Sequence, residues 1–444
     1  MKKLNVKKYF SSARVILLGF LGLILIGSIL LVLPFSSADG SSCSYSDALF
    51  TSVSAVCVTG LVVVDTATHW SLFGQIVILL LIQIGGLGVI TVVVLLTKAL
   101  GIKIGLSQRS TVQEAVSAPK ISGILKFTQF IFIFTFACEV IGAVAMAPAF
   151  IKNLGWAKGI WASLFHSVSA FCNAGFDILG TESAPFSSLT GYASDPLINI
   201  VVMLLIIIGG LGFVTWEDIK RYGFHIKKYC VQSKLILCSA AILIFVPAIY
   251  FFFAEFAYMP FGKRLLCSLF QAVSPRTAGF NTVDASSLSD AGRAVTVVLM
   301  LIGGAPGSTA GGMKTTTAAL LVATAFSVFR KKEDTDLFGR RIGETIVRRA
   351  IAIASTYIAL AFVGGVMISV IEKLPFSACL FETASAIGTV GLTTGITPLL
   401  SIYSRIILMA LMFFGRAGCL TLIYAAVASA KTNAKLPEDK LSVG

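Results

Sequence analysis

Eight apolar runs, each near the length of a lipid bilayer, constrain this chain more than any other feature. They lie near residues 14–33, 76–97, 124–147, 197–215, 235–254, 295–326, 350–371 and 405–429. A spanning helix needs about 20 predominantly apolar residues. The composition agrees, with 56% apolar and 13% charged residues, and it excludes a disordered chain, a soluble enzyme and a secreted disulfide scaffold. We therefore predict an all-α membrane protein with eight full spans.

The basic residues fall between these runs in an alternating pattern. Of the 35 Lys and Arg residues, 25 lie in segments 1–14, 98–126, 217–234, 330–349 and 431–444, and 8 lie in the alternate segments. Cytoplasmic loops are enriched in Lys and Arg. We therefore predict a protein of the cell membrane with both termini, 1–13 and 431–444, in the cytoplasm. The formal charge of +14 then reflects topology and affinity for anionic membrane lipid, and we predict no nucleic-acid partner.

Four outer segments repeat one pattern: a short apolar stretch, then small residues ending in a glycine before Leu or Phe. They read SDALFTSVSAVCVTGL from Ser46, WASLFHSVSAFCNAGF from Trp161, LCSLFQAVSPRTAGF from Leu266 and SACLFETASAIGTVGL from Ser377. Their glycines, Gly60, Gly175, Gly279 and Gly391, are 115, 104 and 112 residues apart. Each apolar stretch is too short to span a bilayer. The third segment is one residue shorter between its Phe and its Gly, so we expect its short helix to end differently.

The inner spans repeat as well, with QIGGLGVIT from Gln83, IIGGLGFVT from Ile207, LIGGAPGST from Leu301 and FFGRAGCLT from Phe413. The unit is therefore a span, a re-entrant short helix, an extended strand and a second span, and all four copies have the same orientation. We predict four pore repeats around one pseudo-four-fold pore, at residues 14–100, 101–216, 217–330 and 331–430.

Extended segments at membrane depth must share a protected centre. Backbone that is not helical is tolerated there only where it lines a wet cavity or is buried in protein. A ring of four strands with inward carbonyls supplies oxygen ligands that replace the hydration shell of a monovalent cation, as in potassium channels. The glycines allow the backbone freedom that inward carbonyls require. The C-terminal ends of the short helices add partial negative charge that favours a cation.

Together with the loop GGAPGSTAGGMKTTT from Gly303 and an intramembrane Arg416, these repeats resemble the Trk/Ktr/HKT superfamily of potassium transporters. The similarity is greatest to the Ktr-type membrane subunits and extends from Arg14 to about Ala430. It implies potassium uptake through a filter of backbone carbonyls. The filter residues it implies are Val58, Thr59, Gly60, Asn173, Ala174, Gly175, Thr277, Ala278, Gly279, Thr389, Val390 and Gly391.

The resemblance also implies partners that composition and spacing do not show. These are a second copy of the chain, with one pore in each protomer of the homodimer, and a separate cytosolic ring of nucleotide-binding regulatory subunits. No cofactor is expected within this chain, and potassium at the filter is the only metal. Whether sodium activates or drives the uptake stays open. Because each repeat keeps a single filter glycine, we expect a preference for potassium with imperfect exclusion of rubidium and sodium.

The third inner span should break. In a helix interior glycine costs about 1 kcal/mol and proline about 3 kcal/mol relative to alanine. We predict a polar loop on the cytoplasmic side of the filter that acts as a gate, as the resemblance also implies. Its residues are Gly303, Gly304, Ala305, Pro306, Gly307, Ser308, Thr309, Gly311, Gly312 and Lys314. For the GGLG stretches of the first two repeats we favour close helix packing instead.

Arg416 is the second predicted gate element. A charge at this depth costs roughly 2.5 to 3.5 kcal/mol on insertion scales, so it points to function. We predict that Arg416 holds the closed state with the loop; the alternative is a structural pair with Glu139 or Glu382. Lys314 serves gating or structure equally well. His166 and Glu382 suit polar supports behind the filter better than ion ligands.

Two other classes of function compete with a pore. An enzyme of the phosphate-binding-loop type is not supported, because Met313 separates Gly312 from Lys314 and no strand–loop–helix context surrounds them. A secondary cation transporter, a symporter with alternating access, also uses broken helices, but typically in inverted repeats. Four parallel units, each with its own re-entrant segment, favour one central pore.

Overall fold

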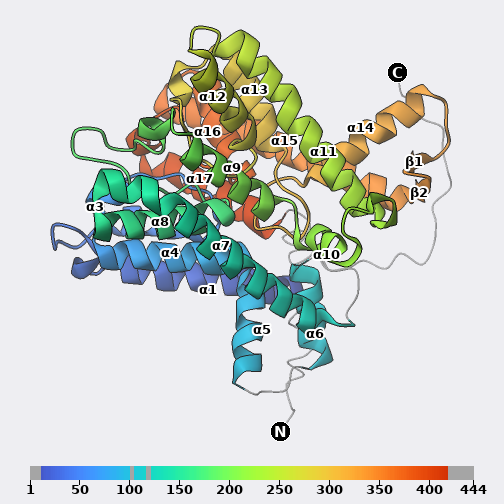
Figure 1. The fold of residues 1–444 in the computed structure, drawn as a ribbon, viewed down its shortest axis with the longest axis horizontal. Coiled ribbons are helices and arrows are strands. Elements are labelled where there is room, and N and C mark those ends of the chain that lie inside the picture. The colour runs from blue at the N-terminus through green and yellow to red at the C-terminus, as the bar shows by residue number, and fades with distance from the viewer. Residues whose placement is uncertain (1–11, 101–104, 117–121, 419–444) are drawn as a thin grey trace.

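The computed structural model describes residues 12–100, 105–116 and 122–418. The two predicted cytoplasmic termini, apart from Ser12 and Ala13, lie outside the described residues. Within the described residues, helices dominate. The strands found there are β1 (Thr335–Leu337) and β2 (Arg340–Ile342), which pair as an antiparallel hairpin with Asp336 opposite Arg341. Figure 1 shows this hairpin at the edge of the molecule, beyond helix α14 (Thr315–Phe329).

Four copies of one helical unit build the protein, which confirms the predicted class of fold. Each copy has a long first helix, a short second helix and a returning third helix. In chain order these are α1 (Ser12–Val32), α2 (Tyr45–Val56) and α4 (Leu72–Leu87); α7 (Ile124–Leu154), α8 (Trp156–Phe171) and α9 (Pro196–Gly210); α11 (Val231–Tyr250), α12 (Phe261–Val273) and α13 (Asp290–Leu301); and α15 (Glu344–Glu372), α16 (Phe376–Gly388) and α17 (Ile402–Ala417).

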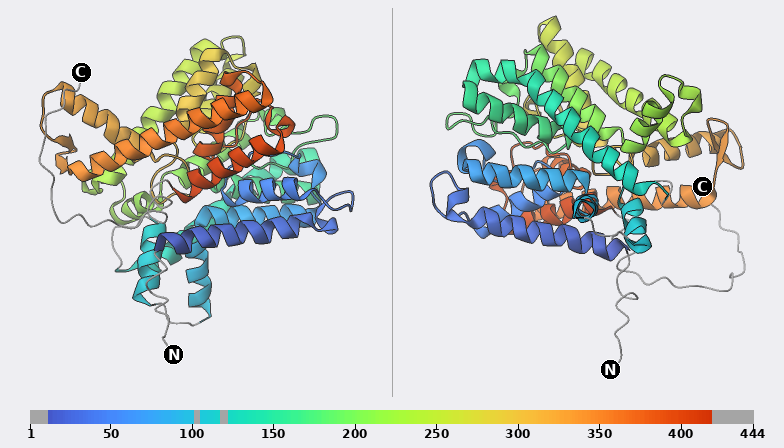
Figure 2. Two further views of the ribbon diagram at one scale, coloured as in Figure 1. Left: turned by 180° about the vertical axis from the view of Figure 1, so that it is seen from behind. Right: turned by 60° about the horizontal axis from the view of Figure 1, so that its bottom comes forward.

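The copies close into a ring. The third helix of each copy packs against the short helix of the next: α4 on α8, α9 on α12, α13 on α16, and α17 back on α2. In Figure 2 the blue first copy and the red fourth copy accordingly lie side by side. Each short helix contributes one fully buried phenylalanine at the same position, namely Phe50, Phe165, Phe270 and Phe381. These rings anchor the short helices inside the protein.

The long first helices meet the length and hydropathy that a membrane span requires. They cover Ala13–Val32, Ile124–Leu154, Val231–Glu255 (which includes a π-helical end at Phe251–Glu255) and Glu344–Glu372. In the first two copies the returning third helix is bent, which the prediction of full spans at 76–97 and 197–215 did not include. Helix α4 meets α5 (Val89–Ala99) at 93°, and α9 meets α10 (Phe213–Tyr222) at 95°.

Glycines with left-handed backbone cause these bends. Gly88 and Gly212 stand between the paired helices with φ of +85° and +84°, values that end a right-handed helix and that favour glycine. In the third copy the predicted break is present, because residues 302–314 separate α13 from α14 without helical structure. In the fourth copy α17 ends before Gly418, also at φ +84°, and the rest of the predicted run 405–429 lies outside the described residues.

Close packing of the inner glycines is confirmed alongside the bends. A Cβ on Gly86 would come within 2.7 Å of Cys172 Sγ, and one on Gly209 or Gly415 would strike the carbonyl of Phe171 or Ile387. The third helices can therefore touch the C-terminal ends of the short helices only because these positions lack side chains. Helix α6 (Leu106–Ala115) and the short α3 (Thr66–His69) are further described α-helices, and several 3-10 turns lie in the connections.

Candidate ion pathway

The four repeat glycines meet around one centre. The side-chain position of each glycine faces the next repeat, where it would collide with a carbonyl oxygen and with the neighbouring glycine. In order, Gly60 faces Ala174 and Gly175, Gly175 faces Ala278 and Gly279, Gly279 faces Val390 and Gly391, and Gly391 faces Thr59 and Gly60. This order closes on itself, so all twelve predicted filter residues lie in one buried ring.

The backbone of every repeat turns twice inside the ring. The residue two positions before each glycine has a positive φ: 56° at Val58, 59° at Asn173, 80° at Thr277 and 51° at Thr389. The glycines follow with φ between 69° and 94°. A positive φ is rare for β-branched residues and persists only where the surrounding structure imposes it. The repeated turn places the carbonyls of Thr59, Ala174, Ala278 and Val390 against the adjacent repeats.

The ends of the short helices support these turns. In three repeats an amide donates back to the carbonyl five residues earlier at 2.8 Å, as Thr59 does to Ser54. In the third repeat Ala278 donates to Ser274 at 2.9 Å, only four residues back. The missing residue in that segment is therefore absorbed at the helix end, as predicted.

Four serines hydrogen-bond the filter strands from behind the ring, and the sequence pattern had not identified them as functional residues. Ser54 Oγ accepts from the Gly60 amide at 3.1 Å and Ser385 Oγ from the Gly391 amide at 3.0 Å. Ser169 Oγ donates to the Phe176 carbonyl at 2.8 Å, and Ser274 Oγ donates to the carbonyl of Phe280. A signal was present in the sequence, because each repeat carries a serine five or six residues before its glycine.

The glycine-rich loop lies directly against the ring. A side chain on Gly311 would collide with Thr389, and one on Gly312 would lie 2.8 Å from the Gly388 carbonyl. On its other side the loop is bonded to the bend between α9 and α10. There Ala305 N donates to Gly210 O at 2.9 Å, and Phe213 N donates to Gly307 O at 2.8 Å.

The loop also has its own internal bonds. Gly303 N donates to Met313 O at 2.7 Å, Thr315 N donates to Gly304 O at 3.0 Å, and Ser308 Oγ donates to Ala305 O at 2.6 Å. Pro306 lies within the same turn. Proline has no backbone N–H, but no helical hydrogen bond is lost here because the segment is not helical. The loop is thus a folded segment with its own internal hydrogen bonds.

Thr309 is the most connected residue of the loop. Its amide donates to Gly209 O at 3.2 Å, and its hydroxyl donates to Phe171 O at 2.9 Å. The same hydroxyl accepts from Nδ2 of Asn173 at 3.0 Å, so a predicted gate residue touches a predicted filter residue.

Arg416 reaches the loop from the last helix. Its guanidinium donates to the carbonyl of Thr309 and to the carbonyls of Gly85 and Gly86, the last at 3.0 Å. The suggested structural pair with Glu139 or Glu382 was wrong. Glu139 instead accepts from Gln83 at 3.2 Å, and Glu382 accepts from threonines. Main-chain oxygens can satisfy a buried guanidinium because its five N–H donors need no carboxylate.

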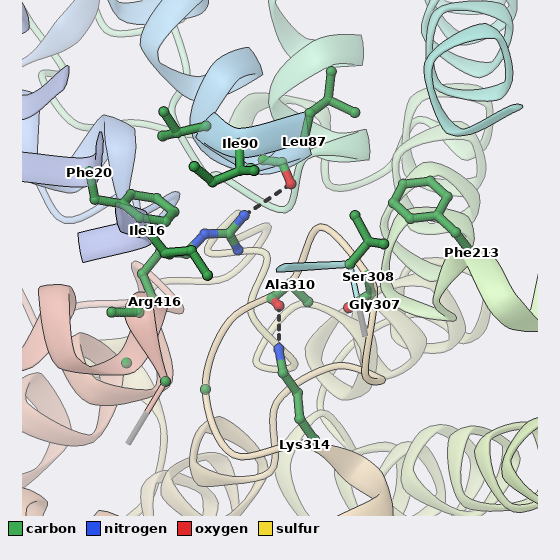
Figure 3. A pocket seen from close by; sticks show the side chains of 18 residues that line it. Ile16, Phe20, Leu87, Ile90, Phe213, Gly307, Ser308, Ala310, Lys314 and Arg416 are labelled. Atoms are coloured by element: carbon green, nitrogen blue, oxygen red, sulfur yellow. Dashed lines mark hydrogen bonds between the residues drawn. The ribbon is translucent and has the colours of Figure 1, made fainter. Parts of the chain in front are cut away.

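A cavity of about 230 Å³ lies beside the loop and Arg416, both of which line it. Figure 3 shows Arg416 and Lys314 in this cavity, each reaching a backbone oxygen, and the Lys314 ammonium donates to Ala310 O at 2.8 Å. The lining comes from five helices (α1, α4, α5, α10 and α17) and the loop, and among the described residues it includes no acidic side chain. Arg416 and Lys314 therefore face this cavity without a carboxylate from the described residues of its lining.

The buried ring, the glycine-rich loop and the long apolar helices define a class: a multi-pass membrane protein built from four repeats around one centre. The chain belongs to the TrkH family, described as cation transport proteins, whose family model matches residues 19–435.

Named relatives cover the whole chain. It is 41% identical to the Potassium/sodium uptake protein NtpJ of Enterococcus hirae, over 100% of this chain and 99% of that protein. It is 38% identical to the Ktr system potassium uptake protein B of Bacillus subtilis, over 98% and 97% of the two chains. The crystal structure of the potassium transporter TrkH from Vibrio parahaemolyticus matches 95% of this chain and 86% of that chain, with a TM-score of 0.74 and 20% identity. That structure shows the same fold.

Proposed function

We propose that this chain takes up potassium across the cell membrane as the ion-translocating subunit of a Ktr-type system. The observation that carries the proposal is the closed ring in which each glycine faces a carbonyl of the next repeat. Four carbonyls at one level are the ligands that a desolvated monovalent cation needs. The printed names of the relatives, which specify potassium uptake, support the choice of ion.

The glycine-rich loop is the proposed gate. Residues 303–314 with Arg416 occupy the pathway between the ring and the cytoplasmic cavity, and a fixed positive charge there raises the barrier for a cation. Opening requires Arg416 to release Thr309, and the loop to move away from the bend beside α10. A backbone held by scattered single hydrogen bonds can make that change more readily than a continuous helix.

Partners and topology are part of the proposal. We infer a homodimer in the cell membrane, both termini in the cytoplasm, and a cytosolic nucleotide-binding ring that moves the gate. The basic segments that alternate along the chain support the orientation. The phrase "Ktr system" in the name of the Bacillus subtilis relative supports a multi-subunit assembly, and "potassium/sodium" in that of the Enterococcus hirae relative supports a role for sodium.

Rubidium and potassium flux into proteoliposomes tests the proposal. Wild-type protein should take up both ions, and Gly279→Asp should abolish uptake because any side chain there meets the Val390 carbonyl. Gly262→Asp is the matched control: it lies in the same repeat, in the first turn of α12, with open space around its Cβ position. Running both with and without a sodium gradient separates activation from coupling. Equal flux through the wild type and Gly279→Asp would refute the proposed pathway.

A further inference from the structure

One position on the short helices carries a different polar residue in each of the four repeats. It is the residue after the buried phenylalanine: Thr51, His166, Gln271 and Glu382. Within the described residues, none of the first three forms a hydrogen bond with the filter strand of its own repeat. His166 Nδ1 bonds the Ala162 carbonyl on its own helix at 2.7 Å, Gln271 Nε2 donates to Thr296 at 3.3 Å, and the Thr51 hydroxyl has no partner among the described residues.

Glu382 instead bonds the segment that follows the filter glycine Gly391 in the chain. Its Oε1 accepts from Thr393 Oγ1 at 2.6 Å and from the Thr394 amide at 2.9 Å, and its Oε2 accepts from Thr397 Oγ1 at 2.6 Å. The residue is 0% exposed. In the part of the chain that the structure describes, no basic side chain forms an ion pair with it. Hydroxyls and an amide therefore satisfy this carboxylate.

The segment that Glu382 holds is the outward continuation of the fourth filter strand. Thr393 follows Gly391 by two residues, and its hydroxyl also bonds the Thr397 hydroxyl at 3.1 Å and the Gly395 amide at 2.9 Å. The outer segments of the second and third repeats bond each other instead, with Leu189 N, which lies 14 residues after Gly175, donating to Asn281 O at 3.1 Å. The fourth repeat relies on a buried carboxylate for the same support.

We propose that Glu382 is a positioning residue that sets the ion selectivity of the ring through the fourth filter strand. The inference rests on the proposed potassium function and names a determinant of it. A hydrogen bond to a charged acceptor contributes more than one to a neutral acceptor, and an amide cannot replace a carboxylate that accepts on both oxygens. Neutralising Glu382 releases Thr397 or Thr393, and the strand at Gly391 then loses its fixed position.

The experiment compares two glutamates of the fourth repeat. Glu372, at the end of α15, also accepts from an amide and two hydroxyls: from Ser401 N at 2.9 Å, Ser401 Oγ at 2.5 Å and Ser404 Oγ at 2.5 Å. Those bonds hold the start of α17 instead of the filter strand. Glu372→Gln therefore reproduces the loss of charge and of hydrogen bonds without touching the ring.

Potassium and sodium uptake by both variants should be measured in proteoliposomes, with the thermal midpoint recorded for each. We expect Glu382→Gln to lower the potassium-to-sodium flux ratio about tenfold, because one lost charged hydrogen bond has about that weight. Glu372→Gln should keep the wild-type ratio. A wild-type ratio in Glu382→Gln, or an equal fall in both variants, overturns the inference. A wild type without potassium preference would instead refute the proposed function.

Thr397 provides a second variant if Glu382→Gln does not assemble. Thr397→Val removes one donor to the carboxylate and keeps the shape, whereas Thr397→Ser keeps the donor. The ratio should fall in the valine variant and recover in the serine variant. Equal ratios in the two would contradict a positioning role for Glu382.

Discussion

Arg416 donates a hydrogen bond to the main-chain oxygen of Thr309, which joins the last helix of the fourth repeat to the middle of the third-repeat loop. The same guanidinium also donates to carbonyls of the first repeat, at Gly85 and Gly86. One side chain thus ties three repeats together at the proposed gate. Removing it should affect the closed state more than the ring.

Arg416→Ala should raise the basal flux of rubidium in proteoliposomes. The substitution removes the bonds that hold the loop and a positive charge from the pathway, so the barrier to a cation falls. Arg293→Ala is the control, because Arg293 is a partly exposed cation that pairs with Asp290 three residues before it, far from the loop. Basal flux equal to that of the wild type, in folded Arg416→Ala protein, would contradict the gate.

Thr309→Val tests the loop from its other side. Valine keeps the shape but loses the hydroxyl that donates to Phe171 and accepts from Asn173. We expect a higher basal flux than in Thr309→Ser, which keeps the hydroxyl. The comparison uses the same rubidium assay. Identical fluxes in the two variants would show that the side-chain contact does not hold the loop.

The sequence predicted the ring well because its information is local and repeated. The turn residues and glycines of four aligned segments indicated one centre, and the glycines with Pro306 indicated the broken helix in the third repeat. The bends at Gly88 and Gly212 were not predicted, since one glycine in an apolar run is compatible with either a bend or close packing. Both occur here.

Partners of buried charges could not be predicted in the same way. Arg416 binds carbonyls of Gly85, Gly86 and Thr309, which are far apart in sequence and brought together only by the ring. Main-chain oxygens carry no signal in the residue types, so a carboxylate looked like the better partner. Ser54 and Ser385 were overlooked because serine is also an ordinary small residue in such segments.

The serines behind the ring should matter for selectivity. Ser385→Ala removes the acceptor of the Gly391 amide, and Ser54→Ala does the same for Gly60. Each loss should cost about 1 kcal/mol of stability and lower the potassium-to-sodium flux ratio. Ser239→Ala is the control, because that hydroxyl donates to carbonyls of its own helix, at Leu235 and Ile236. A ratio that stays unchanged in the double variant Ser54→Ala/Ser385→Ala would exclude the serines as supports.

The first and last repeats are also joined near the beginnings of helices α2 and α17. Arg405 Nη1 lies 2.6 Å from Asp47 Oδ1, with side chains 19% and 24% exposed. Arg405→Gln should lower the free energy of unfolding by about 1.5 to 3 kcal/mol, since a charged and mostly buried hydrogen bond is lost. The thermal midpoint in detergent measures this. Asp47→Asn with Arg405→Gln should not add a second full loss, whereas additive losses would show that the two residues act separately.

Competition among alkali cations tests the central claim most directly. Uptake of labelled rubidium into proteoliposomes should be measured with added potassium, sodium or lithium at equal concentrations. A ring of four carbonyl ligands predicts strong competition by potassium, weaker competition by sodium and least by lithium. Equal competition by all three ions would contradict a pathway built from that ring.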